Sequence, residues 1–340
     1  MPELRILHGG TISMRSKLTA CMLVAAAIAG AQRANADDAP AAAAPSGFRA
    51  LLDKHQREAL RSVAQYVASH PDADDVEQAS SWMFETAVAQ GLEAEVVGPA
   101  EQFLKRRGLD QPSILLAQQA LSMGLARTGK RAEALSVFDS YLKGVRYQSP
   151  FRTLELASSL SAQARIAGDL AGSREIFERL ASAYPLNAQL GEIVEGRIAR
   201  QELIGQPVPR FGASDVEGKR LEMADYSGKV VLVDFWATTC APCLAEFPNL
   251  RQLYKEYHEK GFEIVGVSFD DGPDTVQAFV ARARLPWRMV MDESAEGVVS
   301  QRFKTKTIPA LFLIDRKGNV AQVDVRGNDL RAVIEKLLAQ

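Results

Sequence analysis

The sequence predicts an all-α domain built from helical hairpins, followed by an α/β domain. Between residues 48 and 204, apolar residues recur at spacings of three and four, and no stretch alternates like a strand. From residue 205 onward, short apolar strands alternate with helical segments, which indicates a sheet with helices on both faces. The two prolines of Gly205-Gln206-Pro207-Val208-Pro209 stop a helix and begin an extended segment, so we expect the boundary there.

The first 36 residues are expected to be a signal peptide that exports the protein to the periplasm. Basic residues precede an apolar run over 18–31, and Ala34-Asn35-Ala36 offers a small-x-small cleavage site, with Met14 as the natural start. The run is shorter than the roughly 20 residues that a spanning helix needs. Two alternatives stay open: an uncleaved N-terminal membrane anchor, and lipidation at Cys21. The order of the residues counts against lipidation, because the apolar stretch follows Cys21 instead of preceding it.

Residues 37–47 are rich in Ala and Pro and are expected to form a linker before the helical domain. Breaks at Gly91, Gly129, Gly168 and Pro185, and at His70-Pro71, divide that domain. The helices specified by the pattern are Phe48–Ala68, Val76–Gln90, Ser113–Arg127, Ala132–Leu142 and Arg174–Tyr184.

Part of the helical domain repeats at a constant offset of 39 residues. The matched sets are Gly129, Ala132, Val137, Phe138 and Tyr141, and Gly168, Ala171, Ile176, Phe177 and Leu180. A small residue three positions after a glycine, then a large apolar residue, suits the crossing of two helices in a hairpin. The segment is similar to tetratricopeptide-type arrays, although its period exceeds 34 residues. A plain helical bundle is the alternative.

The α/β domain, residues 205–340, is expected to begin with a hairpin around Glu217-Gly218. The predicted strands are 230–236, 262–269, 287–291, 310–315 and 319–325, and the predicted helices are about 240–259 with a kink near Pro248, 274–284, 296–303 and 328–339. A formal net charge of -2 over 340 residues gives no indication of nucleic-acid binding.

The chemistry is expected at Cys240-Ala241-Pro242-Cys243, where an apolar strand runs into a helix. Unpaired N–H groups and the dipole at a helix N-terminus favour a thiolate, which is the reactive form of cysteine. We therefore expect Cys240 to be the exposed attacking sulfur and Cys243 to be the buried resolving thiol. A structural zinc pair is the alternative, but zinc requires four ligands and the four histidines are scattered, so no metal is expected.

These residues carry a resemblance to a known family. The stretch from Val231 to Pro248 resembles the active-site segment of the thioredoxin superfamily, and 207–340 resembles the TlpA/ResA-type thiol-disulfide oxidoreductases. Supporting marks are Pro207-x-Pro209-x-Phe211, Tyr226-Ser227-Gly228-Lys229, Glu246-Phe247-Pro248, Thr307-Ile308-Pro309 and Phe312-Leu313-Ile314-Asp315. The resemblance implies an α/β thioredoxin fold and dithiol chemistry. The peroxidase function of related peroxiredoxins is not expected, because their Pro-x-x-x-Thr segment before a lone cysteine is absent.

Two carboxylates are predicted to assist the cysteines. Asp234 interrupts the buried strand, where an unpaired carboxylate is costly and its pKa should rise toward the working range. The resemblance implies that it accepts the proton of Cys243. A carboxylate satisfied by a nearby lysine is the alternative. Glu246 lies one helical turn after Cys243, and the resemblance implies that it tunes the cysteines, with an ordinary surface glutamate as the alternative.

The resemblance also implies a substrate-binding segment at Thr307-Ile308-Pro309, with a cis proline peptide facing the cysteines. Trp236 is predicted to pack beside the disulfide and contribute to substrate binding, with an ordinary core position as the alternative. Thr239 departs from the family, in which tryptophan is common before the first cysteine, so specificity for partners stays open.

Together these observations predict an exported protein disulfide reductase that acts through a mixed disulfide and needs no cofactor. Its partners would be protein disulfide substrates, an external electron donor such as a membrane redox protein, and a protein bound to the helical domain. Two alternatives remain: a binding or scaffold protein with an accessory redox domain, and a disulfide-forming oxidase.

Overall fold

The computed structural model describes residues 47–294 and 297–340. The predicted signal peptide and all but the last residue of the predicted linker lie outside these ranges. Residues Asp53–Gln340 form one compact unit, which does not include Phe48–Leu52 at the start of the first helix. Within the described residues, no helix has the length and apolar character to cross a membrane.

The first part of the chain is helical, as predicted. Its elements are α2 (Phe48–Ser69), α3 (Val76–Gln90), the 3-10 helix η1 (Glu93–Val96), α4 (Val97–Phe103), α5 (Gln111–Arg127), α6 (Arg131–Val145), α7 (Pro150–Ile166), α8 (Leu170–Ala183) and α9 (Ala188–Gln201). The five helices that the sequence specified are present, and α4, α7 and α9 are additional to them.

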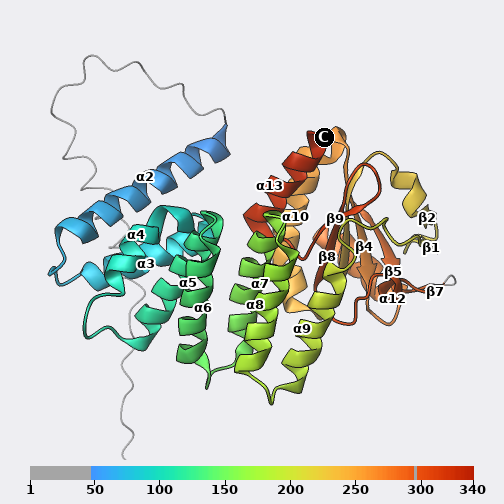
Figure 1. Cartoon of the computed structure of the whole chain (residues 1–340). Coiled ribbons are helices and arrows are strands. Elements are labelled where there is room, and N and C mark those ends of the chain that lie inside the picture. The colour runs from blue at the N-terminus through green and yellow to red at the C-terminus, as the bar shows by residue number, and fades with distance from the viewer. Residues whose placement is uncertain (1–46, 295–296) are drawn as a thin grey trace, which may run out of the picture. The chain divides into compact units, whose positions relative to one another are not determined.

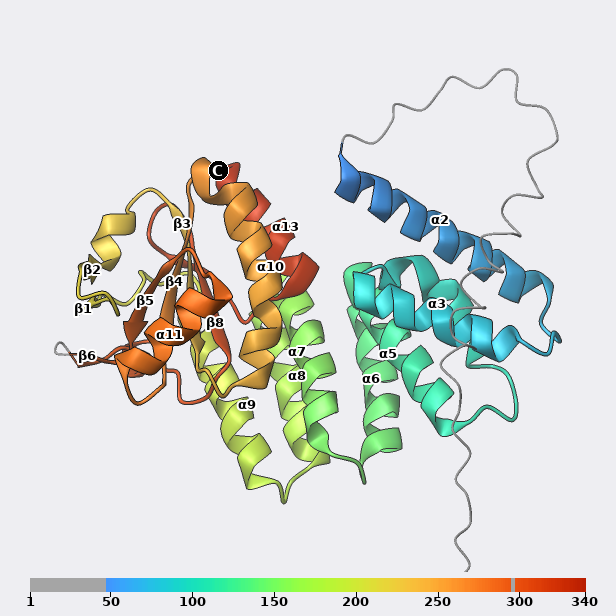
Figure 2. The ribbon, with the colours of Figure 1, turned by 180° about the vertical axis from the view of Figure 1, so that it is seen from behind.

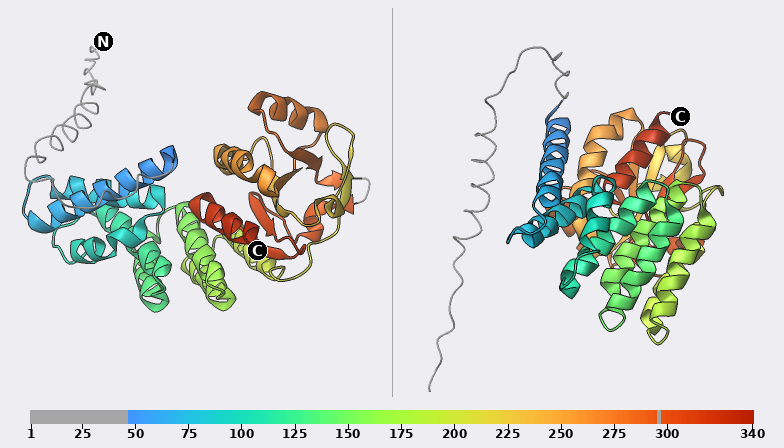
Figure 3. Two further views of the ribbon diagram at one scale, coloured as in Figure 1. Left: turned by 90° about the horizontal axis from the view of Figure 1, so that it is seen from above. Right: turned by 60° about the vertical axis from the view of Figure 1, so that its left-hand side comes forward.

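The repeat of 39 residues corresponds to two helical hairpins, α5–α6 and α7–α8. Helices α5 and α7 begin at Gln111 and Pro150, and α6 and α8 begin at Arg131 and Leu170, so each pair of starts lies 39 residues apart. The hairpin turns contain Gly129 and Gly168 with φ of 78° and 82°, a conformation that side chains disfavour. The hairpins pack side by side (Figures 1 and 3). Membership of the tetratricopeptide class stays a prediction.

The second part of the chain is an α/β domain whose order of elements agrees with the prediction. It comprises β1 (Gly212–Ser214), β2 (Arg220–Glu222), η2 (Met223–Tyr226), β3 (Val230–Trp236), α10 (Ala241–Tyr257), η3 (His258–Lys260), β4 (Phe262–Ser268), α11 (Pro273–Ala283), β5 (Arg288–Met291), β6 (Glu293–Ser294), β7 (Gly297–Val298), α12 (Val299–Arg302), β8 (Ala310–Ile314), β9 (Val320–Val323) and α13 (Gly327–Leu338). The five-stranded sheet has the order β5-β4-β3-β8-β9. Strands β3, β4 and β5 are parallel, whereas β8 and β9 are antiparallel to their neighbours.

The two faces of this sheet carry different covers. Helices α10, α11 and α13 pack on one face over an apolar cluster that includes Leu232 and Trp236 (Figure 2). The other face was also expected to carry helices, but its main cover is the β1–β2 hairpin, with η2 and the four-residue α12. The segment between α9 and β3 is occupied by extended chain, the β1–β2 hairpin and η2, which leaves no length there for a long helix.

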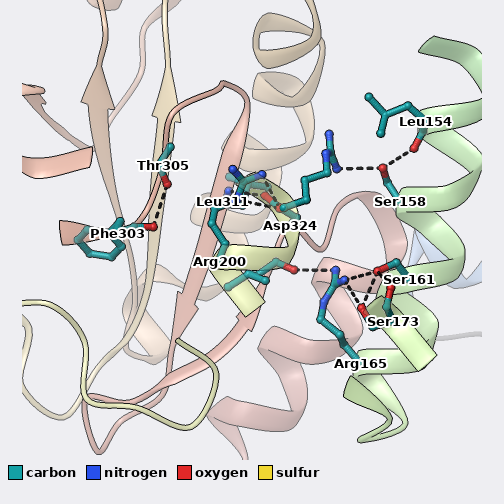
Figure 4. Close-up of polar contacts among 12 residues, drawn as sticks. Leu154, Ser158, Ser161, Arg165, Ser173, Arg200, Phe303, Thr305, Leu311 and Asp324 are labelled. Carbon is teal, nitrogen blue, oxygen red and sulfur yellow. Dashed lines mark hydrogen bonds and ion pairs between the residues drawn. The ribbon is translucent and has the colours of Figure 1, made fainter. Parts of the chain in front are cut away.

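The helical part and the α/β part meet at β9, which packs against α7 and α9. Arg165 donates a hydrogen bond to the carbonyl oxygen of Val323 at 2.9 Å, and Arg200 forms a fully buried ion pair with Asp324 at 2.8 Å (Figure 4). Ala162 and Ile166 of α7 also join the apolar cluster under α10 and α13. Because both parts belong to one compact unit, the predicted division at residue 205 stays a prediction about the chain's organisation.

Candidate active site

The cysteine pair lies where β3 delivers the chain to the start of α10. The valine-rich strand is buried along its whole length, which fixes the position of the loop that follows it. Cys240 is the N-cap residue of α10, and Cys243 lies in the first turn of that helix. The two sulfurs form a disulfide, so the structure represents the oxidised state.

The surroundings of the two sulfurs differ, as the sequence predicted. Cys243 is 3% exposed, whereas Cys240 is half-buried and has exposed neighbours at Thr239 and Ala241. The backbone N–H of Cys243 donates to the Cys240 sulfur at 3.3 Å. Pro242 occupies the first turn, where its missing N–H costs no helical hydrogen bond. This helix N-terminus can stabilise a negative charge on Cys240 once the disulfide is reduced.

Asp234 lies in the middle of β3 and is 3% exposed. Because side chains alternate along a strand, Asp234 points to the same face as Leu232 and Trp236, which is the face that α10 covers. Burial raises the pKa of Asp234 from 3.8 to about 7, while the positive charge of Arg326 lowers it and Glu246 raises it. The predicted direction of this pKa shift is confirmed. The charged groups that act on Asp234 are an arginine and a glutamate, which gives no support to the lysine alternative.

Glu246 is half-buried and connects α10 to the start of α13. Its Oε1 accepts a hydrogen bond from Asn249 at 2.7 Å and another from the backbone N–H of Gly327 at 3.2 Å. The second contact places a carboxylate at the N-terminus of a helix, where a negative charge is favourable. These contacts and its effect on the Asp234 pKa distinguish Glu246 from a freely exposed surface glutamate.

The Thr307-Ile308-Pro309 segment lies at the same edge of the sheet as the disulfide. Phe235 near the end of β3 pairs with Ala310 at the start of β8, so the loops beyond these two residues are neighbours. The Ile308–Pro309 peptide is cis, as the resemblance implied, and all three residues are half-buried. Ile308 and Cys240 both pack against the apolar cluster that contains Cys243.

Trp236 is completely buried and packs against Phe247 and Phe279. Its apolar cluster also contains Cys243, so the predicted packing near the disulfide agrees with the structure. Since the indole does not reach the surface, this position favours the alternative of a core residue, and we do not carry a substrate-binding role forward.

Two features of the site were not predicted from the sequence. Asp270, just after β4, accepts hydrogen bonds from the backbone N–H and the hydroxyl of Thr238, and from Ser268, and so anchors the loop before Cys240. Polar residues after adjacent parallel strands meet at one edge of a sheet, and this rule could have identified Asp270. Arg326 acts on Asp234 from the segment after β9, and no local pattern indicates that proximity.

No three His, Cys, Asp or Glu side chains of the described residues come together in a group that could hold a metal ion. The chemistry available to the site is that of two sulfurs that form and break a disulfide, with Asp234 on the strand before them and Glu246 on the helix that carries them. This arrangement on this fold defines a thiol-disulfide oxidoreductase.

Comparisons with known proteins agree with that class. Residues 204–323 match the model of the AhpC/TSA family. The thiol-disulfide oxidoreductase ResA of Bacillus cereus (strain ATCC 10987 / NRS 248) is 33% identical over 148 residues, which are 43% of this chain and 84% of the relative. ResA of Halalkalibacterium halodurans is 34% identical over 123 residues, which are 36% of this chain and 69% of the relative. The chain belongs, through its α/β domain, to the family of ResA thiol-disulfide oxidoreductases.

Solved structures with similar segments carry related names. The thioredoxin domain of a thiol-disulfide oxidoreductase from Bacteroides vulgatus shares 30% identity and covers 40% of this chain and 97% of its own, with a TM-score of 0.37. A thiol:disulfide interchange protein from Chlorobium tepidum shares 27% identity and covers 39% of this chain and 95% of its own, with a TM-score of 0.33. With these TM-scores, the family assignment rests on the sequence matches.

Proposed function

We propose that this protein is an exported reductase of protein disulfides that acts through Cys240 and Cys243. The observation that carries the proposal is the asymmetry of the pair: Cys240 is half-buried at a helix N-terminus, and Cys243 is buried behind it. A substrate sulfur can approach the first cysteine but not the second. The membership in the thiol-disulfide oxidoreductases supports the same chemistry.

In the first step, the Cys240 thiolate of the reduced protein attacks one sulfur of the substrate disulfide. A bond forms between that sulfur and Cys240, the substrate's own S–S bond breaks, and its second sulfur leaves as a thiolate. The Cys243 N–H that points to the Cys240 sulfur supports the attacking anion.

In the second step, Cys243 loses its proton and attacks the Cys240 sulfur. The mixed disulfide breaks, the remaining substrate sulfur leaves as a thiolate, and the protein is left with the disulfide seen in the structure. Asp234 is the proposed proton acceptor, directly or through a water molecule, because a pKa of about 7 lets it take up a proton at neutral pH. Glu246 is proposed to tune this acceptor, since its charge raises the same pKa.

The direction of the reaction is tested by the reduction potential of the cysteine pair. Reduction is proposed because the Ala-Pro spacer provides no histidine to stabilise the Cys240 thiolate strongly. Equilibration of the mature protein with defined thiol buffers should give a potential near that of thioredoxin, about -270 mV. A value near that of the strong periplasmic oxidant, about -120 mV, would make the protein a disulfide donor instead.

Single cysteine replacements test the assigned order of the two sulfurs. Cys243→Ser should accumulate a mixed disulfide between Cys240 and the substrate, because the second step is blocked. Cys240→Ser should form none, since Cys243 is buried. Trapping through Cys243 would reverse the assignment. A cellular phenotype that survives replacement of both cysteines by serine would favour the alternative of a scaffold protein with an accessory redox domain.

Export and re-reduction are part of the same proposal. The basic and apolar pattern of residues 1–36 supports export, and a fusion of this segment to a reporter enzyme that works only in the periplasm tests it. Each turnover consumes two electrons, so a dithiol donor must reduce the Cys240–Cys243 disulfide again. A membrane-bound dithiol protein is the proposed donor, and a protein partner on the helical domain remains a separate proposal.

A further inference from the structure

A cleft of about 880 Å³ lies between α9 and the segment that leads to the cis proline. One wall belongs to the helical part of the chain and the other to the redox part. The residues used below are Glu192, Glu195 and Gly196 on α9, and Lys304, Lys306 and Thr307 on the opposite wall.

The floor of the cleft lies where α9 approaches Thr307. A Cβ atom added to Gly196 would lie 3.8 Å from the hydroxyl oxygen of Thr307 and 3.7 Å from Nη1 of Arg200. The α9 backbone at Gly196 therefore lies close to Thr307, the residue that leads to the cis proline.

The sheet places this cleft near the disulfide. Across the sheet, β3, which leads to Cys240, is followed by β8 and then by β9. Arg200 of α9 forms an ion pair with Asp324, which lies just after β9. Thr307 lines the cleft and directly precedes the cis Ile308–Pro309 peptide, whose loop neighbours the loop that leads from β3 to Cys240. A polypeptide bonded to Cys240 through its own cysteine can therefore extend along the proline segment into the cleft.

The charges of the cleft indicate what would bind there. Glu192 and Glu195 on α9 are exposed and form no ion pair within the described residues. On the opposite wall, Lys304 is already paired with Glu202 at 2.7 Å, whereas Lys306 is exposed and has no such partner among the described residues. The α9 wall thus offers two carboxylates that form no ion pair among the described residues, opposite one such lysine.

We propose that this cleft binds an extended segment of the substrate polypeptide next to its disulfide, and that Glu192 and Glu195 select a basic side chain on that segment. The inference rests on the proposed function, because it assigns a substrate to the same cysteine pair. It makes α9 of the helical part a specificity element for the redox reaction.

The test compares two model peptides with one small disulfide. Each peptide contains one disulfide and carries either arginine or glutamate three residues from the attacked cysteine, and the small compound is bis(2-hydroxyethyl) disulfide, which is uncharged. The measured quantity is the second-order rate constant for oxidation of the pre-reduced full-length protein. Glu192→Arg/Glu195→Arg should lower the rate constant for the basic peptide about tenfold, the effect expected from two exposed ion pairs, and raise it for the acidic peptide.

The controls separate this inference from the proposed function. Glu178→Arg places the same charge on an exposed position of α8 outside the cleft and should change neither peptide's rate constant. Lys306→Glu should raise the rate constant for the basic peptide. Equal rate constants for both peptides in all variants would overturn the cleft assignment. Failure of the unmodified protein to react even with the small disulfide would instead overturn the proposed function.

Discussion

Replacement of Asp234 by asparagine should remove a pH dependence from the stability of the oxidised protein. Burial raises the pKa of Asp234 from 3.8 to about 7. A carboxyl group whose pKa is raised by folding contributes its full stability below about pH 4, where it is protonated in both states. That contribution is lost as the pH rises toward 7, because the unfolded chain ionises first and the folded protein holds its proton.

The size of this effect follows from the difference between the two pKa values. A difference of about three units, at 1.36 kcal/mol per unit, corresponds to about 4 kcal/mol. No discount for solvent screening is applied, since the side chain is 3% exposed. Asparagine does not titrate, so the stability of Asp234→Asn relative to the unmodified protein should increase by up to about 4 kcal/mol between pH 4 and pH 8.

Urea denaturation of the oxidised protein at several pH values measures this difference. The fluorescence of Trp236 and Trp287, which lie in the apolar cluster under α10, reports on the relevant part of the chain. Any loss of packing in Asp234→Asn should lower the free energy of unfolding by the same amount at every pH and leave its pH dependence unchanged. Asp271→Asn, at an exposed position of the loop after β4, is the matched control. Parallel pH profiles for the unmodified protein and Asp234→Asn would refute the raised pKa.

Four further predictions concern this site and the junction with the helical part. Glu246→Gln removes a charge that raises the Asp234 pKa, so the midpoint of the pH profile just described should move to lower pH, and an unchanged midpoint would contradict the coupling. Arg200→Met leaves Asp324 buried without its ion pair and should lower the free energy of unfolding by about 3–5 kcal/mol, measured by urea denaturation at pH 7. Burial raises the pKa of Asp324, but Arg200 and neighbouring arginines lower it to about 2. As the pH falls from 4 to 2, the unmodified protein should therefore lose about 2 kcal/mol of stability. Asp324→Asn, which has no carboxyl group to titrate at this position, should not show this loss. Asp270→Ala should increase hydrogen exchange at the loop amide it binds, and unchanged exchange would show that the loop is held by other contacts.

The elements that the sequence predicted well are those in which burial follows a simple period. Strand β3 is a continuous apolar run because it is central in the sheet and buried on both faces. Helix α3 was predicted with its observed bounds, Val76–Gln90, because its break at Gly91 is a left-handed C-cap. The positions of Asp234, Cys240 and Cys243 could be predicted for the same reason, because they lie in β3 or at the start of the helix that follows it.

Two of the helices that were not specified, α7 and α9, bury polar residues, which disrupts the apolar pattern. Helix α7 buries Thr153, Ser161 and Arg165, and α9 buries Arg200. These side chains are buried because partners in other elements satisfy them, such as the carbonyl oxygen of Val323 for Arg165. Periodicity within one segment carries no information about such partners, so contacts between the helical part and the sheet could not be predicted.

The first turn of α13 bears on the alternative hypothesis of a scaffold with an accessory redox domain. Its Gly327 N–H donates to Glu246 of the active-site helix, and its Asp329 accepts hydrogen bonds from Arg127 and Gln163 of the helical part. One helix turn therefore joins the helical part to a carboxylate that influences the Asp234 pKa. Deletion of the helical part would remove these contacts along with any binding surface, so loss of activity after deletion would not distinguish the two hypotheses. Replacement of the cysteines leaves this junction intact, and it is therefore the experiment that separates them.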